Sequence, residues 1–147
     1  MDKIAVCINL ASKSHDQLNA LSKYVDLKAK KVEFIHAWNS DNYPHSSGMV
    51  VAFYPNQDQA REIQKKLEED LSKLANEFAE KNQCEVVSKV LNSGSEKRAI
   101  AKYLDESSID LAVCLVEKRD NVSEFFHSSF CHYIQVHAKS NVLCLKQ

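Results

Sequence analysis

Glycine and proline are scarce in this chain. Its 147 residues include two glycines, Gly48 and Gly94, and two prolines, Pro44 and Pro55. Glycine is the residue that most easily takes a positive φ angle and lets the backbone approach a ligand closely. A chain with so little glycine has little material for a glycine-rich loop around a phosphate group. We therefore expect few tight turns and no elaborate phosphate cradle.

Several other features are missing as well. No apolar run approaches the roughly 20 residues that a membrane span needs, and the first residues are too short and wrongly flanked for a secretory signal. With 19 Lys and Arg against 20 Asp and Glu, no broad basic field favours nucleic acid. Five cysteines, an odd number without CxxC spacing, favour a reducing compartment. We expect a cytoplasmic protein with neither a nucleic-acid nor a membrane partner.

Apolar runs alternate with helical patterns along the chain. The run at residues 4–8 lacks polar alternation, which is typical of a parallel strand covered on both faces. Strands are expected at residues 4–8, 32–38, 85–91, 111–116 and 142–145. The first helix is expected after a cap at Ser12 or Ser14, and its apolar stripe consists of Leu18, Leu21, Val25 and Leu27. Three further helices are expected at residues 57–80, 95–107 and 123–137. This order predicts one doubly wound α/β domain, residues 1–147, with five strands and four helices.

Residues 39–56 form the one long segment without a helical or strand pattern. They hold three of the four glycines and prolines, so we expect a loop. Loops of this length in a compact domain are commonly lids or binding loops. The helix expected after it is dense in Glu and Lys on one face, which we interpret as a solvated surface.

The specific motifs lie in the last third of the chain. Asp110-Leu111-Ala112-Val113 leads into the fourth expected strand, and His137-Ala138 stands four residues before Val142 in the last. Gly94 opens the third expected helix. With these motifs, spaced without a gap between Asp110 and Val142, the chain resembles the universal stress protein family over essentially its full length. The resemblance implies a five-stranded parallel sheet in the order 3-2-1-4-5 with four helices, the adenine nucleotide alpha hydrolase-like architecture.

Nucleotide-binding members of that family carry Gly, two residues, Gly, nine residues, and then Gly-Ser or Gly-Thr. The matching positions here are Leu115, Lys118, Ser128 and Ser129, so only the final hydroxyl residue is kept. Side chains at those positions would obstruct the approach of backbone N–H groups to a phosphate. The chain is thus similar to the A type of the family, which lacks the glycine pattern. The resemblance implies a non-enzymatic stress protein without a cofactor and without ATP binding.

An alternative is a nucleotide-binding member with a rebuilt phosphate loop. The loops after the first and fourth strands of a 3-2-1-4-5 sheet meet at the topological switch point, where ligands bind. Asn9 matches the family's acidic residue on the adenine side. In this alternative, the phosphates are held by the side chains of Lys118, Arg119, Ser128 and Ser129. Asn9 and the backbone of Ala37 lie near the base.

Other chemistry has weaker support in the sequence. His127 and Cys131 are four residues apart on one helix face, a spacing found in metal sites, but two ligands without a second cluster do not make one. We therefore expect no metal. Ser128 and Ser129 lack the glycine-flanked turn that activates a nucleophile, so no catalytic residue is expected. A third hypothesis makes Cys131 a redox sensor.

The last expected strand, Val142-Leu143-Cys144-Leu145, is an apolar sheet edge. An exposed edge of this kind pairs readily with another strand. In universal stress proteins this strand pairs antiparallel with its copy, so the resemblance implies a homodimer through these four residues. A frayed edge on a monomer is the alternative. A protein partner is compatible with the non-enzymatic hypothesis.

Overall fold

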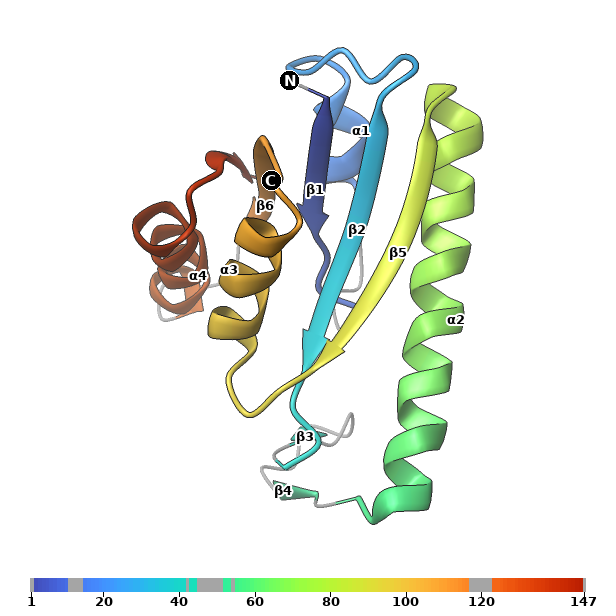
Figure 1. The fold of residues 1–147 in the computed structure, drawn as a ribbon, viewed down its shortest axis with the longest axis vertical. Helices are drawn as coiled ribbons and strands as arrows, with labels where there is room; N and C mark the ends of the chain where they lie inside the picture. The colour runs from blue at the N-terminus through green and yellow to red at the C-terminus, as the bar shows by residue number, and fades with distance from the viewer. Residues whose placement is uncertain are drawn as a thin grey trace.

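The computed structural model describes residues 2–10, 15–41, 43–44, 52–53, 55–116 and 123–146, with side chains except at 43–44, 52–53 and 123–129. Its centre is a five-stranded sheet in which all neighbouring strands are parallel (Figure 1). The strands are β1 (Lys3–Cys7), β2 (Lys31–Trp38), β5 (Glu85–Asn92), β6 (Leu111–Val116) and β7 (Asn141–Lys146). Their order is β5-β2-β1-β6-β7. Numbered along the five strands this is 3-2-1-4-5, so the predicted architecture is confirmed.

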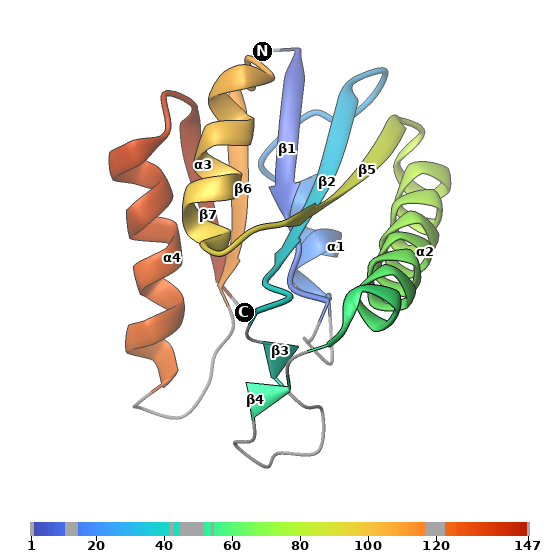
Figure 2. The same cartoon turned by 60° about the horizontal axis from the view of Figure 1, so that its bottom comes forward.

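Within the described part of the chain, four helices cover both faces of the sheet (Figure 2). They are α1 (Gln17–Leu21), α2 (Gln57–Asn82), α3 (Glu96–Glu106) and α4 (Ser123–His137). Successive side chains of a strand point to opposite faces. Val6 and Phe34 therefore pack into the cluster with the residues of α1 and α2, which we call the α1–α2 core. Ala5 and Ile35 pack into the cluster with those of α3 and α4, the α3–α4 core. Burial on both faces explains why the strands read as continuous apolar runs.

The long helix α2 begins at a capping box. The Asn56 side chain accepts a hydrogen bond from the Gln59 backbone N–H at 2.8 Å, and the Gln59 side chain accepts one from the Asn56 backbone N–H at 3.0 Å. Two N–H groups that the helix cannot satisfy internally are thereby bonded. The helix ends at Gln83, whose φ of 51° breaks the helical repeat. The predicted apolar stripe is buried at Leu67 and Leu71 and continues to Phe78.

The first helix is much shorter than predicted. It ends at Leu21, so Val25 and Leu27 lie beyond it, although Leu27 is buried. The expected caps Ser12 and Ser14 lie outside the described residues. Tyr, Val and Asp at residues 24–26 are weak helix formers. The Asp26 carboxylate also accepts the Lys28 backbone N–H at 3.1 Å, a local bond that competes with helix continuation.

The prediction of a loop at residues 39–56 is wrong in part. Two short strands, β3 (Tyr43–Pro44) and β4 (Ala52–Phe53), pair antiparallel and form a separate two-stranded sheet below the carboxyl end of β2 (Figures 1 and 2). Valine and aromatic residues around β4 favour strand structure. In the sequence, the glycine and prolines of the segment favour a loop more strongly than these residues favour a strand.

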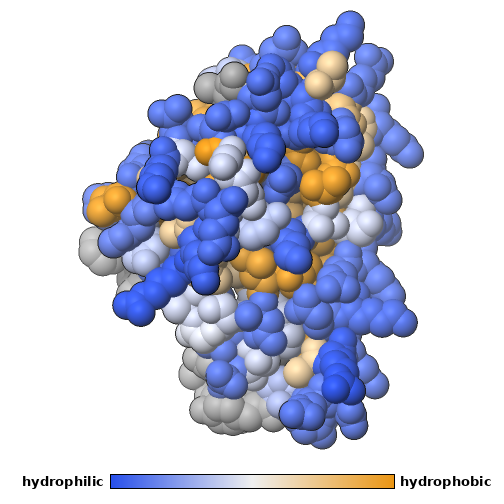
Figure 3. Space-filling model, in the orientation of Figure 1, coloured by the Kyte–Doolittle hydropathy of each residue, from blue (hydrophilic) through white to orange (hydrophobic). Residues whose placement is uncertain are grey.

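The surface in the view of Figure 1 is mainly hydrophilic, with apolar side chains gathered between the α3 side and the α2 side (Figure 3). Val87 on β5 is 51% exposed. Within the described ranges, no helix combines the length and the apolar character needed to cross a membrane.

Candidate functional site

A cavity of about 240 Å³ lies where the strand order reverses. β1 pairs with β2 on one side and with β6 on the other, and ligands of doubly wound sheets bind beyond the carboxyl ends of such strands. The ends of β1 and β2, the first turns of α3, and α4 supply its walls. Its lining includes Cys7, Asn9, His36, Ala37, Ile100 and Phe130.

His36 connects the ends of two strands beside this cavity. Its Nδ1 lies 2.9 Å from the backbone oxygen of Ile8. A carbonyl oxygen accepts hydrogen bonds, so Nδ1 carries the proton in this bond. Burial lowers the pKa of His36, and the bond to Ile8 opposes this shift only in part. The imidazole is therefore a neutral group at physiological pH that holds the chain just before Asn9.

The structure brings Asn9 and Ala37 to the same cavity. Asn9 is an exposed residue, and its backbone oxygen lies 3.1 Å from Nε2 of His15. Ala37 is 8% exposed and packs into the α3–α4 core. The two positions named from the family resemblance thus face one space, although they are 28 residues apart in the chain.

Seven of the nine described lining residues were missed by the sequence analysis, among them Cys7, Ile8 and His36 at the ends of β1 and β2. Glu96 and Lys97 come from the first turn of α3, and burial raises the pKa of the Glu96 carboxyl group. Ile100 and Phe130 supply apolar wall from α3 and α4. The position of Glu96 just after the helix-opening Gly94 was an available signal. Phe130 carried no such signal, because its approach to β1 depends on how α4 packs.

The side chain of Leu115 does not line this cavity. Its partly buried side chain packs against the α1–α2 core, whereas Cys7, Ala37 and Ile100 of the cavity belong to the α3–α4 core. Leu115 therefore fills the core on the other face of the sheet and is not among the described residues that line the cavity. Strand alternation turns its side chain away from this cavity. Its obstruction of a phosphate stays a prediction, because residues 117–122, which follow β6, lie outside the described part.

The end of β6 is held by a buried polar side chain. Gln17, 5% exposed, donates from Nε2 to the backbone oxygen of Val116 at 3.1 Å. Of the predicted phosphate contacts, Lys118 and Arg119 lie outside the described residues. Ser128 and Ser129 belong to the helical backbone of α4, and their side chains lie outside the described part.

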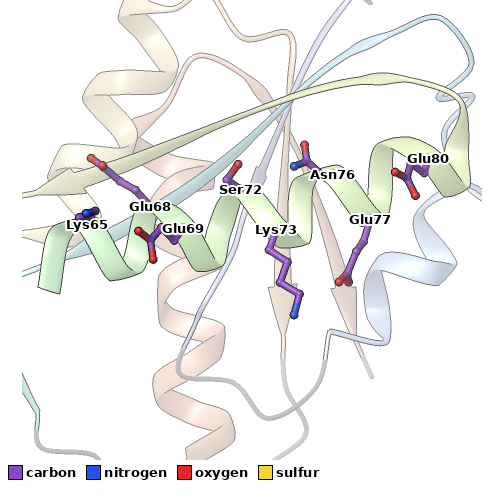
Figure 4. A pocket seen from close by; sticks show the side chains of 8 residues that line it. All are labelled: Lys65, Glu68, Glu69, Ser72, Lys73, Asn76, Glu77 and Glu80. Carbon is purple, nitrogen blue, oxygen red and sulfur yellow. The ribbon is translucent and has the colours of Figure 1, made fainter. Parts of the chain in front are cut away.

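A larger hollow of about 640 Å³ follows the outer surface of α2. All its lining residues belong to this one helix and are polar. Figure 4 shows their side chains spread along several turns instead of converging on one point. On the same helix, Lys66 and Asp70 form an exposed ion pair at 3.2 Å, a contact of little energetic weight. We interpret this hollow as the solvated helix face predicted from the sequence.

Among the described residues, no group of three or more His, Cys, Asp or Glu side chains is arranged to hold a metal ion. The side chain of His127 lies outside that part of the chain. Cys131 is buried at 4% exposure and forms a disulfide bond with Cys144 of β7. This partner was not foreseen in the sequence.

β7 is an edge strand of the five-stranded sheet and pairs with β6 alone. Val142 and Cys144 pack against the α3–α4 core, and Leu143 against the α1–α2 core. These three side chains are half-buried, and Leu145 is 6% exposed. The four residues of the predicted dimer edge therefore anchor the strand to both cores. Among the described residues, no strand pairs with its second side.

These features define the class of protein: a doubly wound α/β domain with a cavity at the switch point, where domains of this class bind ligands. The family model described as the universal stress protein family matches residues 1–146. The chain belongs to this family of stress-response proteins.

Solved structures agree with this fold. A universal stress protein from Archaeoglobus fulgidus in complex with dAMP has 17% identity, covers 99% of this chain and 98% of its own, and gives a TM-score of 0.60. A family protein from Arabidopsis thaliana with AMP bound has 14% identity, covers 100% and 92%, and gives 0.61. The universal stress protein UspA from Lactobacillus plantarum has 12% identity, covers 98% and 97%, and gives 0.62. No curated protein sequence matches the chain.

Proposed function

We propose that this chain is a non-enzymatic, cytoplasmic universal stress protein of the A type, which acts as a homodimer and does not bind ATP. The carrying observation is the cavity at the switch point. Its volume of about 240 Å³ lies below the roughly 300–1,000 Å³ of typical small-molecule sites. Ile100 and Phe130 contribute bulky apolar wall to this cavity.

The sequence of the phosphate region supports the same proposal. Lysine and serine stand at 118 and 128, where nucleotide-binding members have glycine, and leucine stands at 115. Only glycine allows the unhindered backbone approach that a phosphate-binding loop uses.

The chemistry of the cavity favours a role without turnover. Cys7 is the one thiol among its described lining residues. The hydrogen bond with Cys114, together with burial, raises the pKa of the Cys7 thiol well above its ordinary value. A thiol held in its protonated form is a poor nucleophile. Protein contacts, including those of the homodimer, are then the expected output of this protein.

Calorimetry with ATP and magnesium tests the proposal directly. We expect no saturable heat over the micromolar range, with the Archaeoglobus fulgidus relative and dAMP as a positive control for the assay. A micromolar dissociation constant for ATP would overturn it.

A nucleotide-binding function with a rebuilt phosphate loop is the second candidate. Its support is that Asn9 and Ala37 share one cavity and that two structural relatives are described with AMP and dAMP. In this case Lys118→Ala abolishes nucleotide affinity. Lys102→Ala, which removes an exposed lysine paired with Glu106 on α3, leaves it unchanged. Equal affinity of both variants would remove this candidate.

A further inference from the structure

Helix α4 and edge strand β7 bring two cysteines together. Cys131 and Cys144 are separated by 13 positions in the sequence, and their Cα atoms lie 6.6 Å apart. This separation is within the roughly 4.4–6.8 Å that a disulfide bond spans. The structure joins the two sulfur atoms in such a bond. The backbone of both elements thus already accommodates the linked state.

The two sulfur atoms differ in their surroundings. Cys131 is 4% exposed in the α3–α4 core, whereas Cys144 is half-buried. The Gln135 side chain, one turn beyond Cys131, donates from Nε2 toward Sγ of Cys144 at 3.9 Å. A hydrogen bond to a sulfur atom favours its charged form over its neutral form. Cys144 is therefore the more accessible sulfur of the pair and the one with a neighbouring hydrogen-bond donor.

The remaining three cysteines provide an internal contrast. Cys7 and Cys114 are opposite each other in the β1–β6 register, and both are buried. The hydrogen bond with Cys114, together with burial, raises the pKa of Cys7. Burial raises the pKa of Cys84, which lies apart from them on the other side of the sheet and is half-buried. Buried thiols of raised pKa react slowly with oxidants. Selective chemistry at one pair is therefore expected.

We propose that Cys131 and Cys144 form a reversible dithiol–disulfide site that a hydroperoxide closes and a thiol reductant opens. The Cys144 thiolate attacks the peroxide oxygen, the O–O bond breaks, and a sulfenic acid forms with release of hydroxide, which takes up the thiol proton. The Cys131 sulfur then attacks the sulfenic sulfur, and water leaves as the S–S bond forms. In balance, two thiols and one hydrogen peroxide give one disulfide and two waters.

The position of the bond connects two parts of the molecule. Phe130, the neighbour of Cys131, lines the cavity, and Cys144 belongs to edge strand β7. The closed bond fixes this segment of α4 to the edge strand. Cytosolic disulfides are usually transient and redox-sensing, so the reversibility of the bond rests on the proposed cytoplasmic location. Closure of the bond does not depend on ATP binding or on the dimer.

Thiol counting by mass spectrometry tests the site. The reduced wild-type protein is exposed to stoichiometric hydrogen peroxide, quenched in acid, unfolded, and alkylated with N-ethylmaleimide. We expect the five alkylated cysteines of the reduced chain to fall to three, with one peptide pair linked through Cys131 and Cys144. Dithiothreitol should restore all five. Five alkylated cysteines after peroxide, or a link involving another cysteine, would overturn the proposal.

Matched variants separate the roles of the two sulfur atoms. Cys84→Ser serves as the control and should still lose two alkylation sites. Cys131→Ser should form no internal link and should retain a dimedone-reactive sulfenic acid at Cys144. Dimedone labelling spread evenly over the other cysteines would contradict the assigned order of attack. The wild-type measurement is decisive by itself if a variant does not fold, and it is unaffected by whether ATP binds.

Discussion

The hydrogen bond between Trp38 and Gln64 offers a quantitative test of how α2 holds the end of β2. Trp38 is 3% exposed, and its indole Nε1–H donates to Oε1 of Gln64 at 2.6 Å. The Gln64 amide in turn donates to the backbone oxygen of Val90 at 3.3 Å. Trp38 follows Ala37 of the cavity wall, so this bond fixes the strand end that borders the site. Gln64→Leu keeps the side-chain volume and removes the acceptor.

The magnitude follows from the burial of the indole. Removing one partner of a buried hydrogen bond costs about 1–3 kcal/mol. With a urea dependence of about 2 kcal/mol per molar, the unfolding midpoint should fall by about 0.5–1.5 M. Glu68→Ala is the matched control, because it removes the exposed contact of Gln64 with Glu68 at 2.9 Å and leaves the indole bond in place. Its stability should stay within about 0.5 kcal/mol of the wild type.

The assay is urea unfolding followed by tryptophan fluorescence, since Trp38 is the chain's one tryptophan. The emission of folded Gln64→Leu should also shift, because the charge distribution around the indole N–H changes. Equal unfolding midpoints for Gln64→Leu, Glu68→Ala and the wild type would refute the reasoning. The hydrogen bond between Trp38 of β2 and Gln64 of α2 would then contribute nothing measurable to the free energy of unfolding.

Three further predictions concern the disulfide, the amino terminus and the edge strand. Reduction of Cys131–Cys144, with its sequence separation of 13, should lower the free energy of unfolding by about 3 kcal/mol; melts with and without dithiothreitol measure this, and an equal effect of reductant on Cys131→Ser would contradict it. The backbone N–H groups of Lys3 and Asp2 donate to Asp110 and lower its carboxyl pKa. The contribution of the ionised Asp110 carboxylate to the free energy of unfolding is thus present above the ordinary Asp pKa of about 3.9. It is lost as the pH falls through the lower folded-state pKa. Asp110→Asn should therefore destabilise at neutral pH and converge with the wild type in acid, and a constant difference across that range would be the opposing result. Leu143→Lys should shift the sedimenting species from dimer to monomer, with Lys146→Ala as the control; a wild-type chain that sediments as a monomer would remove the dimer.

The sheet was predictable because its strands are buried on both faces. A strand such as β6 then appears as an unbroken apolar run, and its predicted bounds of 111–116 coincide with those of the structure. The stripe of α2 was equally visible, since a long amphipathic helix repeats its pattern over many turns. The short helix α1 was overestimated, because apolar residues at 25 and 27 continue the spacing without continuing the helix. Spacing records which residues are buried, and the local hydrogen bonds decide the backbone.

The candidate site was predictable only where a family pattern marked it. Asn9 and Ala37 were named from such a pattern, and both line the cavity. His36 precedes Ala37 by one position and was passed over, because a histidine inside a strand shows no partner in the sequence. Its bond to the Ile8 oxygen joins two strands. A contact of that kind depends on strand pairing, which the order of residues along the chain does not display.

Local pattern therefore determined the class of this protein: alternating buried strands and amphipathic helices, with little glycine in the chain. Tertiary structure decided the direction of Leu115 into the α1–α2 core and the meeting of Cys131 with Cys144. The physical reason is the range of the interactions. The periodicity of burial depends on residues that are close together in the sequence. Strand register and helix packing bring together side chains that are far apart in the sequence, and no local pattern predicts their contact.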